Sequence, residues 1–142
     1  MADVQQVFGN LDADPNKRGR RMAMFRGWRG KCPNCGEGKL FQGYLASTET
    51  CAPCGEELYH HRADDFPAYL VIFIIGHTLI PAFLAAYFFI DMGPWAQVAL
   101  WLPLTIVATL YLLPRVKGAV IGLQWALRMH GFGGRDEDTY EL

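Results

Sequence analysis

The feature that most restricts the possible folds is a stretch of 23 residues, from Ala68 to Ile90, that contains no Asp, Glu, Lys or Arg. As an α-helix it would be about 34 Å long, enough to cross the roughly 30 Å hydrocarbon core of a bilayer. A second stretch without these charges runs from Ala96 to Pro114. The residues between them, DMGPW, are typical of a tight turn because Gly and Pro break helices. The sequence therefore predicts a transmembrane helical hairpin with spans at about 68–90 and 96–114, so that residues 66–114 form one unit.

Composition also favours a membrane protein. Half of the chain (51%) is hydrophobic and only 19% is charged, against roughly 25% in an average soluble domain. This balance excludes a chain that is disordered throughout. A buried helix pair in a soluble protein is the alternative, but the rest of the chain offers too few amphipathic elements to cover such a pair. We therefore expect a mainly α-helical membrane protein.

The distribution of basic residues predicts the orientation in the membrane. Nine Lys and Arg residues precede the first span and four follow the second, whereas the turn has none. Because cytoplasmic segments are enriched in Lys and Arg, both termini are expected in the cytoplasm. The first span is expected to act as an uncleaved insertion signal. Residues 1–24 and 132–142 are predicted to be disordered tails.

Two cysteine pairs precede the first span, in the sequences CPNCG and CAPCG, with fifteen residues between the pairs. This spacing is typical of a tetrahedral zinc site in which each pair forms a turn that presents two thiolates. Residues 25–65 are accordingly predicted to form a zinc ribbon, with short strands at about Leu40–Leu45 and Leu58–His60. Four protein ligands leave no position for a reactive water, so we expect one structural zinc per chain. The predicted ligands are Cys32, Cys35, Cys51 and Cys54.

Other chemistries can use four cysteines. Iron is a less favoured occupant of the same ligand set. Disulfides are not expected, because the predicted orientation places the cysteines in the reducing cytoplasm. A thioredoxin-like redox pair would need a βαβ context, which this sequence lacks.

A polar cluster lies between the second cysteine pair and the first span, and it consists of His60, His61, Asp64 and Asp65. One hypothesis is a second metal site or a proton relay. We favour the simpler interpretation that Asp64 and Asp65 cap the first span, where negative charge suits the helix dipole.

His77 lies about 15 Å along the first span, at a depth where ionisable residues are rare and often functional. We expect a neutral imidazole that forms a hydrogen bond across the hairpin to Thr105 or Thr109. Contact with a partner membrane subunit and ligation of a haem or copper cofactor are the alternatives.

A basic segment precedes the cysteines: residues 17–31 hold seven Lys and Arg residues and no acid. Such a segment can bind nucleic acid through its phosphates, but next to a membrane anchor it binds anionic lipid headgroups more readily. We therefore expect Arg18, Arg20 and Arg21 to contact lipid or a partner, and we expect no nucleic-acid ligand.

The segment after the second span, residues 115–131, has the pattern of a helix. Its apolar residues fall on one face, and Lys117 and Arg128 fall on another. A basic amphipathic helix directly after a span is predicted to lie along the cytoplasmic interface. Lys117 and Arg128 are therefore further candidate contacts to lipid or to a partner.

Several strings together resemble a known bacterial membrane family, catalogued as domain of unknown function 983. They are RGWRGKCPNCGEGKLFQGYL, the second cysteine pair, ADDFPAYLVIFIIGH and KGAVIGLQWALRMHGF, and they cover about residues 25–132. The resemblance implies an inner-membrane protein of Gram-negative, chiefly alphaproteobacterial, type. It also implies a genetic neighbourhood that includes haem–copper cytochrome oxidase and its assembly factors.

The combined prediction is a non-enzymatic interaction protein: a cytoplasmic zinc ribbon, a two-helix transmembrane hairpin and an interfacial helix. By the resemblance, its partner would be a larger membrane complex such as cytochrome oxidase, which it would serve as a small subunit or an assembly factor. A metal- or haem-handling protein and a membrane-tethered nucleic-acid or regulatory module are the alternatives. The sequence contains no nucleophile–base pair and no phosphate-binding glycine loop.

Overall fold

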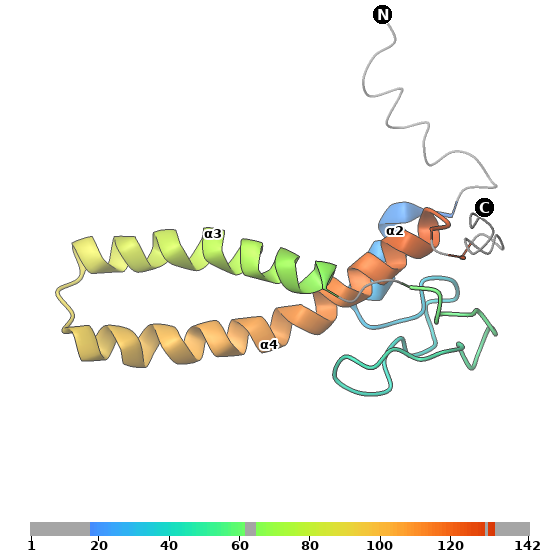
Figure 1. Ribbon diagram of the computed structural model, residues 1–142, viewed down its shortest axis with the longest axis horizontal. Helices are drawn as coiled ribbons and strands as arrows, with labels where there is room; N and C mark the ends of the chain where they lie inside the picture. Colours follow the sequence, from blue (N-terminus) through green and yellow to red (C-terminus); the bar gives the residue numbers. More distant parts are fainter. Residues whose placement is uncertain (1–17, 62–64, 130, 133–142) are drawn as a thin grey trace, which may run out of the picture.

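The computed structural model describes residues 18–61, 65–129 and 131–132. Its described residues form three α-helices: α2 (Arg20–Trp28), α3 (Phe66–Phe89) and α4 (Pro94–Ala126). Figure 1 shows α3 and α4 running antiparallel as a long hairpin. The helix α2 and the irregular segment 29–61 gather at the end of the hairpin where α3 begins and α4 ends (Figure 1). That segment contains all four cysteines and is called the cysteine unit below.

Both hairpin helices are long and apolar enough to cross a bilayer, which confirms the predicted pair of apolar helices. Only 6% of the most apolar part of each helix is buried inside the molecule. A core helix of a soluble protein would be mostly buried, so the exposure of these apolar side chains favours contact with lipid or with other membrane helices.

The helix α3 begins where Pro67 occupies one of the first two helical positions, where its missing N–H costs no hydrogen bond. Asp65 occupies the N-cap position, as predicted, but its side chain makes no capping hydrogen bond. Its backbone carbonyl instead accepts hydrogen bonds from the N–H groups of Ala68 and Tyr69. Asp64, the other predicted cap, lies outside the described residues.

The helix α4 corrects the predicted boundary at residue 114. It continues through Pro114 to Ala126 without interruption, for 33 residues, so the second span and the predicted interfacial helix are one element. At 1.5 Å per residue it is about 50 Å long, which exceeds the membrane core by several turns. The part beyond Pro114 does not lie alone on the membrane surface, because Val116, Val120 and Ile121 are buried in the core.

The helix α2 corrects a second boundary, since residues 20–24 were predicted to belong to a disordered tail. They form the first turns of α2, which packs against α4. At the crossing Gly27 meets Gly118, and a Cβ on either glycine would collide with the carbonyl oxygen of the other. A Cβ on Gly122 would likewise collide with the carbonyl oxygen of Ala23. Small residues four positions apart on both helices therefore allow the two backbones to touch.

The predicted zinc ribbon is not confirmed as a β structure. In place of strands, the described residues contain three isolated bridges, which join Lys31 to Lys39, Phe41 to Ser47 and Thr50 to Glu57. Each of these bridges joins a single residue pair, which gives too few backbone hydrogen bonds to form a strand. The unit is therefore held by its turns and by packing around Leu40 and Leu58, both fully buried.

A single hydrophobic core joins the cysteine unit, α2, α4 and the start of α3. Phe132, which was placed in the disordered tail, is buried in this core with only 4% of its surface exposed. The buried hydrophobic residues are Ala23, Cys32, Leu40, Cys51, Leu58, Val71, Val116, Val120, Ile121, Trp125 and Phe132. The cysteine unit is thus packed against the helices and shares one hydrophobic core with them.

Candidate metal centre

The two cysteine pairs adopt the same turn twice. The N–H of Gly36 donates to the carbonyl of Cys32 at 2.9 Å, and the N–H of Gly55 donates to the carbonyl of Cys51 at 2.8 Å. The two glycines have φ angles of 75° and 72°, in the left-handed region that residues with a side chain rarely adopt. Each turn thereby folds back beneath its pair of sulfurs, as the sequence spacing predicted.

The four sulfurs of the predicted ligand group converge and form a possible metal-binding site. All four Sγ atoms lie within 4.8 Å of one another. The sulfurs of Cys32 and Cys54 are 3.8 Å apart, and those of Cys35 and Cys51 are 3.7 Å apart. Four sulfurs placed about 2.3 Å from a central zinc would be about 3.8 Å from one another, so the donor set fits a tetrahedral metal ion. The same distances are far too long for disulfides, and all four cysteines are free.

The protein environment affects the four thiols differently. The backbone N–H groups of Gly38 and Glu37 lower the pKa of Cys35 to about 6, and the Glu37 N–H lies 3.4 Å from its sulfur. Burial raises the pKa of both Cys32 and Cys51. A metal ion that binds here would therefore find one thiolate largely formed and would have to displace protons from the buried pair.

Gly38 provides the space that the second turn requires. A Cβ at this position would collide with the sulfur of Cys51 and would lie 3.1 Å from Cδ of Pro53. The carbonyl of Gly38 also accepts a hydrogen bond from the N–H of Cys32 at 2.8 Å. This glycine thus contacts both cysteine turns, and the sequence pattern gives no indication of these contacts.

Arg26 of α2 supports the first turn. Its guanidinium donates to the carbonyls of Pro33 at 3.1 Å and Asn34 at 2.6 Å. The guanidinium also lies close beneath the turn, since a Cβ on Gly36 would be 2.8 Å from Nε of Arg26. In the sequence Arg26 is one of seven basic residues in the segment 17–31, and its spacing from the cysteines gives no signal for this contact.

The second turn is connected to α4 through Glu56. Its carboxylate accepts a hydrogen bond from the indole N–H of Trp125 at 2.7 Å and one from Asn34 at 3.2 Å. Arg18 joins the same cluster, with its guanidinium 4.2 Å from the centre of the Trp125 ring and 3.8 Å from the Glu56 carboxylate. Arg18 also donates to the carbonyls of Trp125 and Phe132, at 3.1 and 3.2 Å.

These contacts revise the predicted roles of two basic residues. Arg18 was expected to contact lipid or a partner, but in the structure it joins three segments of its own chain. Lys117 is likewise engaged internally, because its Nζ donates to the carbonyl of Leu45 at 2.9 Å. Arg21 and Arg128 are exposed and Arg20 is half-buried, so their predicted contacts remain predictions.

The polar cluster before α3 is only partly assembled. His60 Nε2 and the hydroxyl of Tyr59 both lie within hydrogen-bond distance of the same Glu57 oxygen, at 3.1 and 3.2 Å. His61 is half-buried, and Asp65 occupies the N-cap position of α3. The structure brings only the cysteines together as a potential metal-ligand group within the residues that it describes. Asp64, the fourth member of the cluster, lies outside the described residues, so a second metal site here stays a hypothesis.

The predicted hydrogen bond of His77 across the hairpin is wrong. Its Nδ1 lies 2.9 Å from the carbonyl of Phe73, one turn earlier on the same helix. Thr105 and Thr109, the expected partners, donate to the carbonyls of Trp101 and Thr105 on their own helix, both at 2.8 Å. The reason is local: a carbonyl four residues back is within reach of these side chains without any contact between helices.

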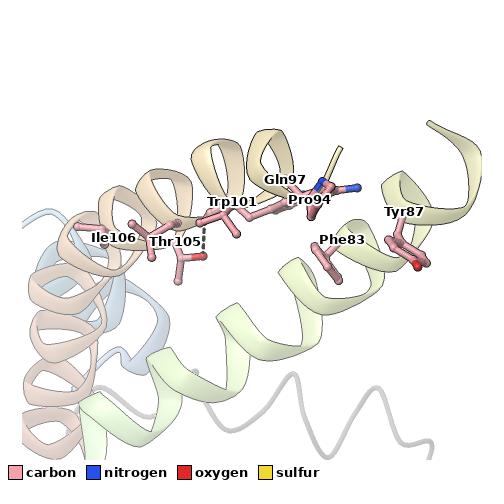
Figure 2. A pocket seen from close by; sticks show the side chains of 9 residues that line it. Phe83, Tyr87, Pro94, Gln97, Trp101, Thr105 and Ile106 are labelled. Carbon is pink, nitrogen blue, oxygen red and sulfur yellow. Dashed lines mark hydrogen bonds between the residues drawn. The ribbon is translucent and has the colours of Figure 1, made fainter. Parts of the chain in front are cut away.

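An apolar groove of about 560 Å³ opens between the far ends of α3 and α4 (Figure 2). Figure 2 shows Phe83 on α3 facing Trp101 on α4, and the two rings meet edge to face with centres 5.8 Å apart. Gln97 is 5% exposed and accepts a hydrogen bond from the Trp101 indole N–H at 3.0 Å. Its Nε2 has no hydrogen-bond partner among the residues that the structure describes. The groove is lined by Phe83, Tyr87, Pro94, Gln97, Val98, Trp101, Leu102, Thr105 and Ile106.

The fold and the site together define a class of protein. It has two apolar helices long enough to span a membrane, and a candidate four-sulfur metal site is packed at one end of them. The chain belongs to the family described as protein of unknown function (DUF983), whose sequence profile matches residues 41–125. The match includes the second cysteine pair, the whole of α3 and nearly all of α4. The suspected resemblance is thereby confirmed. Comparisons with curated proteins and with solved structures gave no match.

Proposed function

We propose that this protein is a non-enzymatic interaction protein of the bacterial inner membrane, with a structural zinc on its cytoplasmic side. Its hairpin would bind a transmembrane helix of a larger membrane complex. The observation that carries the proposal is the groove between α3 and α4, whose wall contains a buried amide donor without a partner in the described part of the chain.

The arrangement of the sulfurs supports a structural role for the metal. Four protein ligands complete a tetrahedron and leave no site where a substrate or a water could bind the ion. The cysteine unit also needs such a centre, because Pro33, Leu40 and Leu58 are its only fully buried side chains other than cysteines. A segment with so little apolar material gains its folding energy from a bound metal. Zinc is the proposed occupant because it favours this closed four-sulfur geometry.

The groove supports a membrane partner. Lipid tails satisfy apolar surface, but they offer no acceptor to an amide N–H at the wall of a groove. Membrane helices, in contrast, associate through close packing supplemented by hydrogen bonds from side chains such as Gln. A transmembrane helix in this groove would contact Trp101 and Leu102 and could supply an acceptor for Gln97.

The distribution of basic residues supports an orientation with the cysteine unit in the cytoplasm, because all thirteen Lys and Arg residues lie outside the hairpin turn. By the family resemblance, the proposed complex is a haem–copper cytochrome oxidase, which the protein would serve as a small subunit or an assembly factor. The engagement of Arg18 with its own chain gives no support to a nucleic-acid surface in the basic segment.

The test is affinity purification of the tagged, full-length protein from detergent-solubilised membranes, followed by identification of the recovered proteins and metal analysis. We expect oxidase subunits and one zinc per chain. Recovery of the protein without any membrane partner would contradict the proposed function.

A matched pair of variants on α4 tests the groove itself. Leu102 lines the groove and Leu100 does not, although both are exposed leucines on the same helix. Leu102→Trp would fill the groove and should abolish recovery of the partner, whereas Leu100→Trp should leave it unchanged. Equal recovery with the two variants would show that the partner binds elsewhere.

A further inference from the structure

The loop of residues 42–46 is a closed turn at one edge of the cysteine unit. A bridge between Phe41 and Ser47 brings its two ends together, and the N–H of Gln42 donates to the carbonyl of Ala46 at 2.8 Å. Tyr44, near the tip, is 50% exposed. The loop is therefore a defined structural element with an aromatic side chain at its end.

This loop is attached to α4 at two points on either side of the membrane boundary. The hydroxyl of Tyr44 donates to the carbonyl of Leu110, and Lys117 Nζ donates to the carbonyl of Leu45 at 2.9 Å. Leu110 lies four residues inside the uncharged run that ends at Pro114, whereas Lys117 lies three residues beyond it. The loop thus runs along about 10 Å of α4, across the level at which the apolar span ends.

Two other features mark the same level. In Figure 1 the loop extends along α4 as far as the first turn of α3, the helix that enters the proposed membrane from this side. The guanidinium of Arg115 lies 4.1 Å from the centre of the Tyr111 ring. Tyrosine beside a basic residue is typical of the region where a span meets the lipid headgroups.

We propose that the loop 42–46 lies in the phospholipid headgroup and glycerol layer of the same bilayer that α3 and α4 cross, so that the cysteine unit binds lipid directly. The surface would comprise Gln42, Gly43, Tyr44 and Ala46, all exposed in the structure. The half-exposed ring of Tyr44 fits this layer because it has an apolar body and a polar tip. The proposal rests on the membrane placement in the proposed function, but it does not depend on any protein partner.

The opposite side of the cysteine unit is predicted to be far from the bilayer. Glu56, next to the second cysteine turn, binds Trp125, fifteen residues further along α4 than Leu110. That separation corresponds to about 22 Å of helix. Ala52 lies in this second turn and is exposed, as is Ala46 in the loop. The two alanines therefore form a matched pair for measuring contact with lipid.

The experiment incorporates the photo-crosslinking residue p-benzoylphenylalanine in place of Ala46, Ala52 or Val107 in the full-length protein. Val107 is an exposed residue of α4 that does not line the groove. Each variant is reconstituted in liposomes of phosphatidylethanolamine and phosphatidylglycerol, illuminated, and analysed by mass spectrometry for attached lipid. Bound zinc is measured in each sample, and Gln42 serves as a second loop position if the Ala46 variant loses its zinc. We expect lipid adducts at Val107 and at the loop position, and several-fold fewer at Ala52.

Each result has one meaning. Adducts at Val107 with equally few at the loop and at Ala52 would overturn the inference and leave the membrane hairpin intact. Few adducts at Val107 as well would overturn both the inference and the membrane placement on which it rests. Crosslinks from the loop to a second protein chain, in place of lipid, would also overturn it.

Discussion

The hydroxyl of Tyr44 donates a hydrogen bond to the carbonyl of Leu110, and Leu110 is the residue whose helical donor is missing because Pro114 has no N–H. A proline inside a helix leaves the carbonyl four residues earlier without its normal partner. Here a side chain from the cysteine unit supplies the missing donor. The contact satisfies the carbonyl that Pro114 leaves without its helical partner, and it joins the cysteine unit to α4.

Tyr44→Phe should therefore destabilise the protein by about 1 kcal/mol, the usual net value of one hydrogen bond. The measurement is thermal unfolding in detergent. Pro114→Ala restores an N–H opposite the Leu110 carbonyl, so Tyr44→Phe should cost less in that background. Equal costs in the two backgrounds would mean that the tyrosine does not compensate for the proline.

Gly118→Ala should separate α2 from α4, because the new Cβ would collide with the carbonyl oxygen of Gly27. In a helix, replacing glycine with alanine normally stabilises the protein by up to about 1 kcal/mol. A loss of stability in Gly118→Ala would therefore be opposite to the usual effect of this substitution. We expect a loss of about 1–3 kcal/mol, typical of overpacking. Gly76→Ala in α3 is the control, because its Cβ would have no neighbour closer than 4.0 Å. A stable Gly118→Ala variant would contradict the observed crossing.

Gly38→Ala should weaken metal binding without removing a ligand, since its Cβ would push against the sulfur of Cys51. The measurement is the zinc content per chain after dialysis against a weak chelator. Gly43→Ala is the matched control, because its Cβ would make only an ordinary 3.8 Å contact with Ala46. We expect zinc to be lost from the first variant and kept by the second; unchanged zinc in both would argue against the described site.

Metal affinity should fall steeply with decreasing pH. Burial raises the pKa of Cys32 and Cys51, so in the metal-free protein both are protonated at neutral pH, and zinc must displace their protons. Each displaced proton lowers the affinity about tenfold per unit decrease in pH. Cys35, with its pKa lowered to about 6, adds to this loss only below that pH. Chelator competition between about pH 8 and 5 measures the slope, and a flat profile would exclude thiolate ligands with these properties.

Arg18→Lys should destabilise the protein in neutral detergent by an amount on the order of 1 kcal/mol. Lysine keeps the charge but loses the flat guanidinium that stacks on Trp125 and donates to two carbonyls. Arg21→Lys, at an exposed position, is the control and should have no effect. If Arg18 acted through anionic lipid, both variants would behave alike in a detergent that contains no lipid.

The hairpin and the ligand group could be predicted because their signals are local in the sequence. An uncharged run of spanning length has few alternatives, and a repeated Cys-x2-Cys-Gly sequence defines one turn geometry twice. Both depend on residues that are close together in the chain. The structure has the two long helices and the converging sulfurs where these signals placed them.

The remaining features depend on contacts between distant residues. The helix α2 buries Ala23 and Gly27, and two small residues give no hydrophobic periodicity, although their spacing matches that of Gly118 and Gly122. Pro114 normally favours a helix end, and the donor that replaces its missing N–H, the hydroxyl of Tyr44, lies far away in the sequence.

The predicted contacts of the basic residues with lipid or a partner were based on their charge alone. Arg18, Arg26 and Lys117 all donate to backbone carbonyls of other segments, and charge gives no indication of such partners. The short strands expected in the cysteine unit were inferred from a family of metal sites, not from an alternating pattern, and isolated bridges replace them.

The continuity of α4 has a mechanical consequence. A single helix reaches from Pro94, at the distal turn of the hairpin, to Trp125, which holds the second cysteine turn through Glu56. The cysteine unit is attached to this helix through Tyr44, Lys117 and Glu56. A change in the direction of α4 relative to α3 would therefore move the sulfur centre as well.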